Sequence, residues 1–359
     1  MENQYKKIVV KIGTNVLTKL NGLLDQKVMY DLVLQVIELK KQNIDVILVT
    51  SGAMGAGRSM IKLSEKMNDV VKRQILASVG QPKLINTYSN FFSEFNYLCA
   101  QILATKEDFR DRIHYLNMKN CFNALFQDNI VPIVNENDVV SVTELMFTDN
   151  DELAGLIASM MSVDALILLT NVDGIFDGNP YDKDSKVIPI IESDSKIKNH
   201  ISPEKSQFGR GGMVTKCNIA HKMSLVGITT HIANGKTPNV LIDICNKKEI
   251  GTKFLFQKDA SNVKKWIAHS EGYEKGIVYI NQGASDALFS KDKAISLLPV
   301  GIEKIDGVFE KGDIIKVCNT NKEVLALGMA QYSSNKANTL IGQKGQKPLI
   351  HYDYLFLKE

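Results

Sequence analysis

The sequence VILVTSGAMGAGR, residues 46–58, decides the fold class of this chain. Its first four residues are apolar and rich in β-branched side chains, which is typical of a strand buried on both faces of a parallel sheet. Thr50, Ser51 and Gly52 follow at the carboxyl end of that strand, where open α/β sheets bind their ligands. The glycines leave two interpretations open: an anion-binding loop with exposed backbone N–H groups, or a tight strand-to-helix turn that needs glycine for its dihedral angles.

A strand and a helix precede this stretch and complete a β-α-β unit. Residues 8–12 (IVVKI) form an apolar run interrupted by one lysine, and apolar residues recur at helical spacing over residues 25–42. Strand, helix and strand in this order are typical of a parallel sheet. Lys11 lies near the end of the first strand, and because an unpaired buried ammonium group is costly, its side chain must reach solvent or meet an anion.

The same alternation of strands and helices continues along the chain. We predict strands at 97–103, 130–134 and 165–169, and helices at 69–79, 82–95, 115–127, 153–161 and 217–225. Polar clusters follow several of these strands or open the next helix: NEND at 135–138, DND at 149–151 and TNVD at 170–173. Each cluster alone is typical of a helix cap or a turn. Their recurrence at successive strand ends favours one shared binding site.

Two glycine-rich segments fail the regular nucleotide-binding motifs. QFGRGGMVTK, residues 207–216, lacks the GK[ST] ending of a Walker A loop. GAMGAG, residues 52–57, does not match GxGxxG, and no acidic residue ends a strand about 20 residues later, as a dinucleotide site requires. The sequence therefore disfavours a nicotinamide enzyme of the Rossmann type.

The composition is that of an ordinary globular protein, with 44% hydrophobic and 23% charged residues in 359, a length that predicts two domains. Short strands at 277–280, 314–317 and 324–330 predict a small β-rich domain, so we expect domains at 1–258 and 274–359 joined by a linker at 259–273. No run resembles a signal peptide or a membrane span. The five cysteines are scattered and never spaced as CxxC, which favours a cytoplasmic location and no metal site built from protein ligands.

Six segments identify the chain as similar to the glutamate 5-kinases of the amino acid kinase family: KIGTN (11–15), VTSGAMGAG (49–57), NEND (135–138), DND (149–151), LLTNVDGIF (168–176) and GRGGMVTK (209–216). NEND together with DND favours glutamate as acceptor over acetylglutamate, aspartate, carbamate or UMP. The resemblance implies a three-layer αβα sandwich with a mostly parallel central sheet. The C-terminal part resembles a PUA domain through SLLPVGI (296–302), GDIIKV (312–317) and GMAQYSS (328–334), with a shortened helical segment before a final strand at 349–357.

The resemblance implies transfer of the γ-phosphoryl group of ATP, with Mg²⁺, to the side-chain carboxylate of L-glutamate. This is the first step of proline biosynthesis, and the family implies feedback inhibition by proline and a homo-oligomer, either a dimer or a tetramer. A glutamate carboxylate has a reference pKa of about 4.3 and is ionised at neutral pH, so no general base is needed. Catalysis then consists of positioning and charge neutralisation.

The matched motifs also imply roles for individual residues, in three groups. The catalytic group is Lys11, Asp151 and Lys216, with the aspartate holding the two lysines. The glutamate site is formed by Ser51, Gly52, Asn135, Asp138 and Asn150. The ATP site is formed by Lys11, Thr170, Asn171, Arg210, Gly211, Gly212, Met213, Val214, Thr215 and Lys216. Position 171 is commonly acidic in the family, so Asn171 leaves the purine and ribose contacts open.

Two further classes compete with this interpretation. The chain could be another amino acid kinase with a different acceptor, which NEND disfavours. It could be an RNA-binding or RNA-modifying protein built around the PUA-like domain. Residues 273–359 hold 11 lysines, 10 acidic residues and no arginine, a balance that disfavours a phosphate-binding face.

Overall fold

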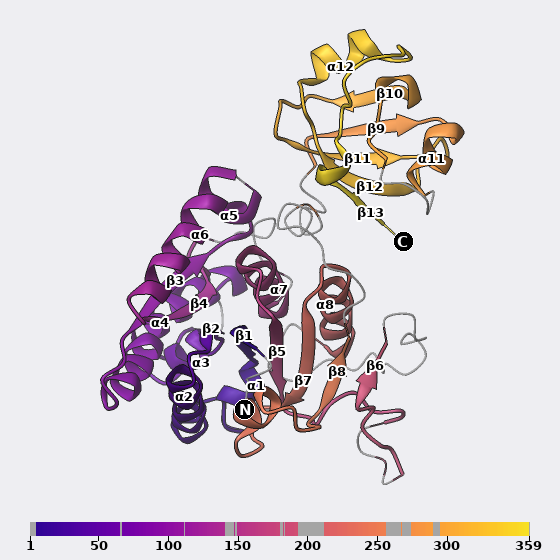
Figure 1. Cartoon of the computed structure of the whole chain (residues 1–359). Coiled ribbons are helices and arrows are strands. Elements are labelled where there is room, and N and C mark those ends of the chain that lie inside the picture. Colours follow the sequence, from indigo (N-terminus) through magenta and orange to yellow (C-terminus); the bar gives the residue numbers. More distant parts are fainter. Residues whose placement is uncertain are drawn as a thin grey trace. The chain divides into compact units, whose positions relative to one another are not determined.

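The computed structural model describes residues 5–64, 67–110, 112–140, 147, 149–179, 182, 184–192, 212–255, 267, 274–289 and 295–358. The chain forms two compact units, Met1–Lys258 and Asp259–Glu359 (Figure 1). Each unit has its own sheet and its own hydrophobic core. Among the described residues, none of the helices combines the length and apolar character that a membrane crossing requires.

The described part of the first unit is built on an eight-stranded sheet in the order β3-β4-β2-β1-β5-β7-β8-β6. Neighbouring strands are parallel except for β7 with β8. In the central strands almost every residue is buried, as expected for a parallel sheet covered on both faces. The strands are β1 (Lys7–Ile12), β2 (Asp45–Val49), β3 (Cys99–Ala104), β4 (Val131–Glu136), β5 (Ala165–Thr170), β6 (Ile190–Ile191), β7 (Thr229–Asn234) and β8 (Thr252–Phe254).

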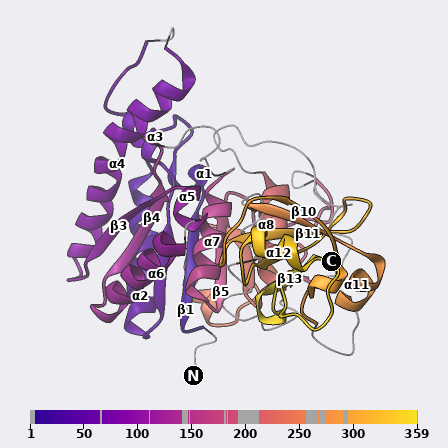
Figure 2. The same ribbon diagram turned by 90° about the horizontal axis from the view of Figure 1, so that it is seen from above.

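Helices cover both faces of this sheet (Figures 1 and 2). They are α1 (Thr14–Leu17), α2 (Gln26–Lys41), α3 (Ala53–Arg58), α4 (Asp69–Ser93), α5 (Lys106–Arg110), α6 (Arg112–Gln127), α7 (Asn150–Met161), α8 (Met213–Leu225) and α9 (Val240–Cys245). The α/β class and the mostly parallel sheet are therefore confirmed.

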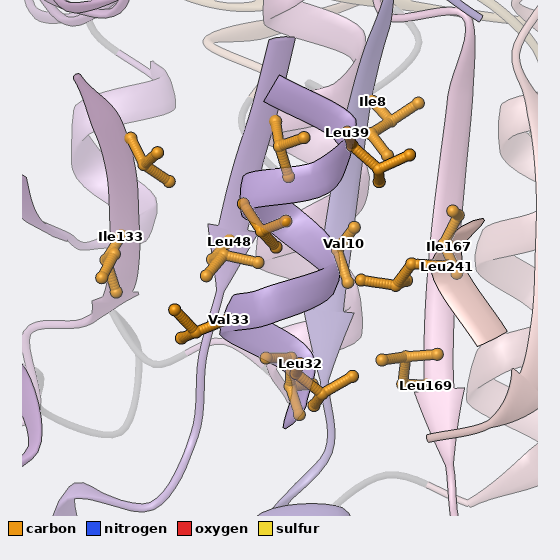
Figure 3. Packing of buried hydrophobic residues seen from close by; sticks show 14 of the residues in the cluster. Ile8, Val10, Leu32, Val33, Leu39, Leu48, Ile133, Ile167, Leu169 and Leu241 are labelled. Atoms are coloured by element: carbon orange, nitrogen blue, oxygen red, sulfur yellow. The ribbon is translucent and has the colours of Figure 1, made fainter. Parts of the chain in front are cut away.

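The core between the sheet and α2 shows how the apolar pattern of the sequence produces these layers. Leu32, Val33 and Leu39 of α2 pack against β1 and β2, with Leu241 of α9 beside them (Figure 3). From β1, this cluster takes Ile8 and Val10, and also Ile12. Because successive side chains of a strand point to opposite faces, the residues between them, including Lys11, face the other layer of helices.

One expectation about the helices is wrong. The segments 69–79 and 82–95 do not form two helices but one, α4, which runs from Asp69 to Ser93 with Pro82 inside it. A proline removes one hydrogen bond from a helix interior without preventing the helix from continuing when its neighbours hold it. Here Leu84, Tyr88 and Phe92 beyond the proline are fully buried in the core.

The glycines of residues 52–57 have separate roles. Gly52 has φ +104°, the left-handed region that favours glycine, and α3 starts directly after it. Gly57 lies within α3, where an added Cβ would overlap the carbonyl oxygen of Leu76 on α4. Gly80 of α4 approaches α3 equally closely, because its Cβ would overlap the carbonyl oxygen of Ala53. The turn interpretation therefore holds for Gly52, while Gly57 serves helix packing.

The part of the second unit that the structure describes contains a five-stranded sheet in the order β10-β9-β11-β12-β13. Its strands are β9 (Gly276–Ile280), β10 (Ile302–Gly307), β11 (Ile314–Cys318), β12 (Val324–Met329) and β13 (Leu355–Leu357), with helices α11 (Gln282–Leu288) and α12 (Ser334–Leu340). The predicted strand at 349–357 is wrong in extent. Ile350 makes only an isolated bridge with Leu297, and a 3₁₀ turn at Tyr352–Tyr354 separates it from β13.

Candidate active site

The polar clusters predicted from the sequence lie where β1, β2, β4 and β5 end. These four strands are parallel, so their carboxyl ends share one edge of the sheet. The backbone N–H of Gly13, after β1, donates to the carbonyl of Leu169 in β5 (3.2 Å), which joins two of the ends directly. The first turn of α7 contributes Asn150 and Asp151.

Asp151 forms ion pairs with two lysines. Lys11 Nζ lies 2.6 Å from its Oδ1, and Lys216 Nζ lies 2.9 Å from its Oδ2. All three residues are buried, and they come from β1, α7 and α8. Burial alone would raise the pKa of Asp151, but the charges of Lys11 and Lys216 outweigh it and hold that pKa at about 2. The carboxylate is therefore ionised at neutral pH.

This arrangement explains why a lysine is found in the apolar strand β1. Lys11 lies on the face of β1 opposite to α2, and its ammonium group meets an anion rather than solvent. The lysine is tolerated in a buried strand because Asp151 compensates its charge.

Asp149 fixes the first turn of α7. It occupies the N-cap position, and its Oδ1 accepts hydrogen bonds from the backbone N–H groups of Asp151 (2.9 Å) and Glu152 (3.1 Å). Burial, together with the negative charge of Asp151, raises the pKa of Asp149 to about 6. The cap holds Asp151 in the position in which it meets both lysines.

A cluster of amides joins the ends of β2 and β4. Asn150 Nδ2 lies 2.7 Å from the carbonyl oxygen of Thr50, 3.0 Å from Ser51 Oγ and 3.1 Å from Asn135 Oδ1. Asn135 Nδ2 in turn donates to Gln81 Oε1 of α4 at 2.9 Å. Ser51, Asn135 and Asn150, which the sequence assigns to one site, are thus brought together.

Asp138 lies beyond β4 and forms an ion pair with Arg73 of α4, with 2.8 Å between Arg73 Nη2 and Asp138 Oδ1. Burial raises the pKa of Asp138, and the charge of Arg73 works in the opposite direction. The sequence reasoning did not identify Arg73 or Gln81. Two turns of helix separate them, so they share one face of α4, a pattern that in a sequence resembles an ordinary solvated face.

The predicted nucleotide residues fall into two groups. Thr170 and Asn171 end β5, with Thr170 Oγ1 lying 3.4 Å from Asn171 Oδ1. Met213, Val214, Thr215 and Lys216 form the first turn of α8, and Gly212 at its N-cap has no side chain to cap the first backbone N–H groups. Such a helix start suits an anion. Arg210 and Gly211 lie outside the described residues.

Within the ranges that the structure describes, no three His, Cys, Asp or Glu side chains are grouped so that they could hold a metal ion.

Comparison with known proteins identifies the family to which this chain is similar. A model of the amino acid kinase family matches residues 6–234, and a PUA domain model matches residues 276–352. The glutamate 5-kinase of Chlorobaculum tepidum is 55% identical, over 98% of both chains. That of Bacteroides thetaiotaomicron is 48% identical over the whole of both. Among solved structures, carbamate kinase from Giardia lamblia bound to AMP-PNP superposes with a TM-score of 0.52 at 18% identity, covering 71% of this chain and 99% of that one, which shows a shared fold.

Proposed function

This chain belongs to the glutamate 5-kinase family, and we propose from this membership how its residues carry out the reaction. The reaction is ATP-dependent phosphorylation of the side-chain carboxylate of L-glutamate to L-glutamyl 5-phosphate, in proline biosynthesis. Binding and transfer are carried out, in this proposal, by side chains and backbone groups at the carboxyl ends of the parallel strands and at the starts of α7 and α8.

The ion pairs of Asp151 with Lys11 and Lys216 carry the proposal. Transfer brings a carboxylate against a triphosphate, and two like unit charges 4 Å apart repel by about 4 kcal/mol at an effective dielectric constant of 20. Asp151 holds the ammonium groups of both lysines together where the strands end, so two cations are available to the incoming anions. We propose that Lys11 bridges the transferring phosphoryl group and the β-phosphate, and that Lys216 approaches from the nucleotide side.

The acceptor glutamate binds, in this proposal, at the ends of β2 and β4. Asp138 pairs with the α-ammonium group, while the hydroxyl of Ser51 and the backbone N–H of Gly52 receive a carboxylate. Asn135 and Asn150 complete the site, which is supported by the amide contacts that already hold Asn150 against Ser51. No residue acts as general base, because the attacking carboxylate is ionised at neutral pH.

ATP binds along the start of α8 and the end of β5. The backbone N–H groups of Met213, Val214 and Thr215 face the phosphates, with Gly212 allowing close approach. Arg210 and Gly211 are assigned to the same nucleotide site. Thr170 and Asn171 contact the nucleoside. We propose that Mg²⁺ enters with the triphosphate, whose oxygens and bound waters supply its preferred ligands.

We further propose that proline inhibits the enzyme at or near the glutamate site, that the chain forms a homodimer or a homotetramer, and that it is located in the cytoplasm. We also propose that the domains span residues 1–258 and 274–359 and are joined by a linker at 259–273. For the PUA-like unit, the near-balanced charge of residues 273–359 favours a role other than RNA binding.

A hydroxamate assay tests the function. Purified protein is given ATP, Mg²⁺ and hydroxylamine with L-glutamate, aspartate or N-acetylglutamate as acceptor, with and without proline. We expect hydroxamate to form with glutamate but not with aspartate or N-acetylglutamate. We expect less hydroxamate from glutamate when proline is present. Product with another acceptor would move the chain to a different amino acid kinase reaction. No product with any acceptor would overturn the function.

A further inference from the structure

Gln81 of α4 contacts the proposed glutamate site without belonging to any of the matched motifs. Its Oε1 accepts a hydrogen bond from Asn135 Nδ2 at 2.9 Å. Gln81 is half-buried and Asn135 is almost fully buried, so the bond is largely protected from water. A contact of this kind sets the orientation of the asparagine amide.

The direction of every bond in the cluster is set by its backbone partners. The N–H of Glu136 can only donate, and it donates to Asn135 Oδ1 at 2.9 Å. Asn135 Nδ2 must then face Gln81, and Gln81 must present its oxygen. Because Asn135 Oδ1 is an acceptor, Asn150 has to point its Nδ2 toward it, as it also does toward the carbonyl of Thr50.

These hydrogen-bond directions determine whether the hydroxyl of Ser51 donates or accepts a hydrogen bond when a ligand binds. Asn150 shares its two N–H bonds among three acceptors, one of which is Ser51 Oγ. Ser51 Oγ therefore accepts from Asn150, and its own hydrogen remains to be donated to a carboxylate.

We propose that Gln81 is a positioning residue for the acceptor amino acid, acting through Asn135 on Asn150 and Ser51. The inference rests on the proposed function, since it concerns the same glutamate site. Without Gln81, the buried Asn135 Nδ2 loses its partner, and the asparagine has to turn to find another. Asn150 then loses the acceptor that orients it.

The packing of α4 explains why a glutamine of this helix reaches the strand ends. Gly80, next to Gln81, lies so close to α3 that a Cβ would overlap the carbonyl oxygen of Ala53. The same helix holds Asp138 through Arg73 and the carbonyl of Val139 through Gln74, whose Nε2 lies 2.9 Å from that oxygen. The α4 helix thus holds Asp138 and Val139, which follow shortly after β4.

The test replaces Gln81 by methionine, and in parallel by leucine in case one variant fails to fold. Both side chains lack the acceptor and are compatible with a helix. We expect the KM for glutamate to rise about tenfold, equivalent to about 1.4 kcal/mol, while the KM for ATP changes by less than about twofold. Asn86→Met, at an exposed position of the same helix, is the matched control and should leave both values unchanged.

A double-mutant cycle separates positioning from a general structural role. If Gln81 acts through Asn135, then Gln81→Met combined with Asn135→Ala should raise the KM for glutamate no more than Asn135→Ala alone. Effects that multiply, an equal rise in both KM values, or no rise would overturn the inference. A wild-type protein without glutamate-dependent hydroxamate would instead overturn the proposed function itself.

Discussion

The ammonium group of Lys11 lies 2.6 Å from the carboxylate of Asp151, with both side chains buried, at a place where the sequence alone shows only a lysine out of place in an apolar strand. Lys216 occupies the other carboxylate oxygen at 2.9 Å. One aspartate thus holds together two cations that would otherwise repel each other. A pair of cations held in this way is suited to a phosphoryl group in transfer.

Replacing Asp151 by asparagine should lower both stability and activity. The two lysines would keep their positions only with two uncompensated buried charges, and breaking a buried ion pair on one side costs about 3–5 kcal/mol. Urea denaturation measures this loss. Glu38→Gln is the control, because the exposed pair of Glu38 with Lys41 contributes at most about 1 kcal/mol. An Asp151→Asn protein as stable as the wild type would contradict the prediction.

Replacing Lys11 or Lys216 by methionine should lower kcat about a hundredfold or more, with only a modest change in the KM for glutamate. In the proposed mechanism, these two lysines act on charge that develops during transfer. Lys40→Met is the matched control, since Lys40 of α2 is also a buried lysine paired with an aspartate, but its partner Asp45 lies at the amino end of β2, the end opposite to the candidate site. It should affect stability and leave kcat unchanged. A Lys11 or Lys216 effect confined to KM would refute the assignment.

Asp138→Asn should weaken glutamate binding far more than ATP binding. Asparagine keeps an acceptor oxygen but loses the charge that, in the proposed glutamate site, pairs with the α-ammonium group, and hydrogen bonds to charged groups contribute about 1.5–3 kcal/mol. We therefore expect the KM for glutamate to rise by about ten- to a hundredfold. The KM for ATP, measured in the same titrations, is the internal control, and an equal rise in both would count against the role of Asp138.

The fold of the first unit could largely be predicted because its central strands are continuous apolar runs. β1, β2 and β5 are of this kind. The strand β7, TTHIAN, is not predicted from the sequence because its first residues are polar. His231 is buried there, 2.8 Å from the hydroxyl of Tyr5, and burial lowers the pKa of His231 to about 3. A polar strand satisfied by distant partners leaves no local pattern to detect.

The residues of the candidate site also differ in how well they could be predicted from the sequence. Lys11 stands out in the sequence because its type conflicts with its position, whereas Asp151 alone is typical of a helix start and is predicted only through the resemblance of the DND segment to the family. Arg73 and Gln81 do not stand out, because a polar residue on a long helix is usually solvated. Their roles depend on the approach of α4 to the strand ends, which only the tertiary structure reveals.

Gly57→Ala should destabilise the first unit by about 1–3 kcal/mol, as overpacked sites do. The added methyl group would overlap the carbonyl oxygen of Leu76, a backbone atom that cannot turn aside. Gly283→Ala in α11 is the control, because the nearest atom to its Cβ lies 3.6 Å away. It should be neutral or slightly stabilising, as expected for Gly→Ala inside a helix. Thermal melting that gave the same shift for both variants would contradict the close packing of α3 on α4 as the cause.

Glu136 should make the first unit less stable as the pH rises from about 4.5 to about 7. Burial, and next the charge of Asp138, raise the pKa of Glu136 from 4.5 to about 7, although its Oε1 accepts a hydrogen bond from the N–H of Phe147 at 3.0 Å. Between these two pH values the folded state binds more protons at this carboxyl than the unfolded state does. The free energy of unfolding therefore falls as the pH rises from about 4.5 to about 7, and at higher pH it stays at this lower value.

Glu136→Gln keeps the length of the side chain and an acceptor for Phe147 but removes the titration. At pH 8 we expect the variant to be more stable than the wild type by about 1–3 kcal/mol, and near pH 4.5 we expect the two to be equal. Urea denaturation at several pH values between these limits measures the difference. Unfolding free energies that stay parallel across the whole range would mean that Glu136 ionises at its ordinary pKa. The burial of this carboxyl beside Asp138 would then have no electrostatic consequence.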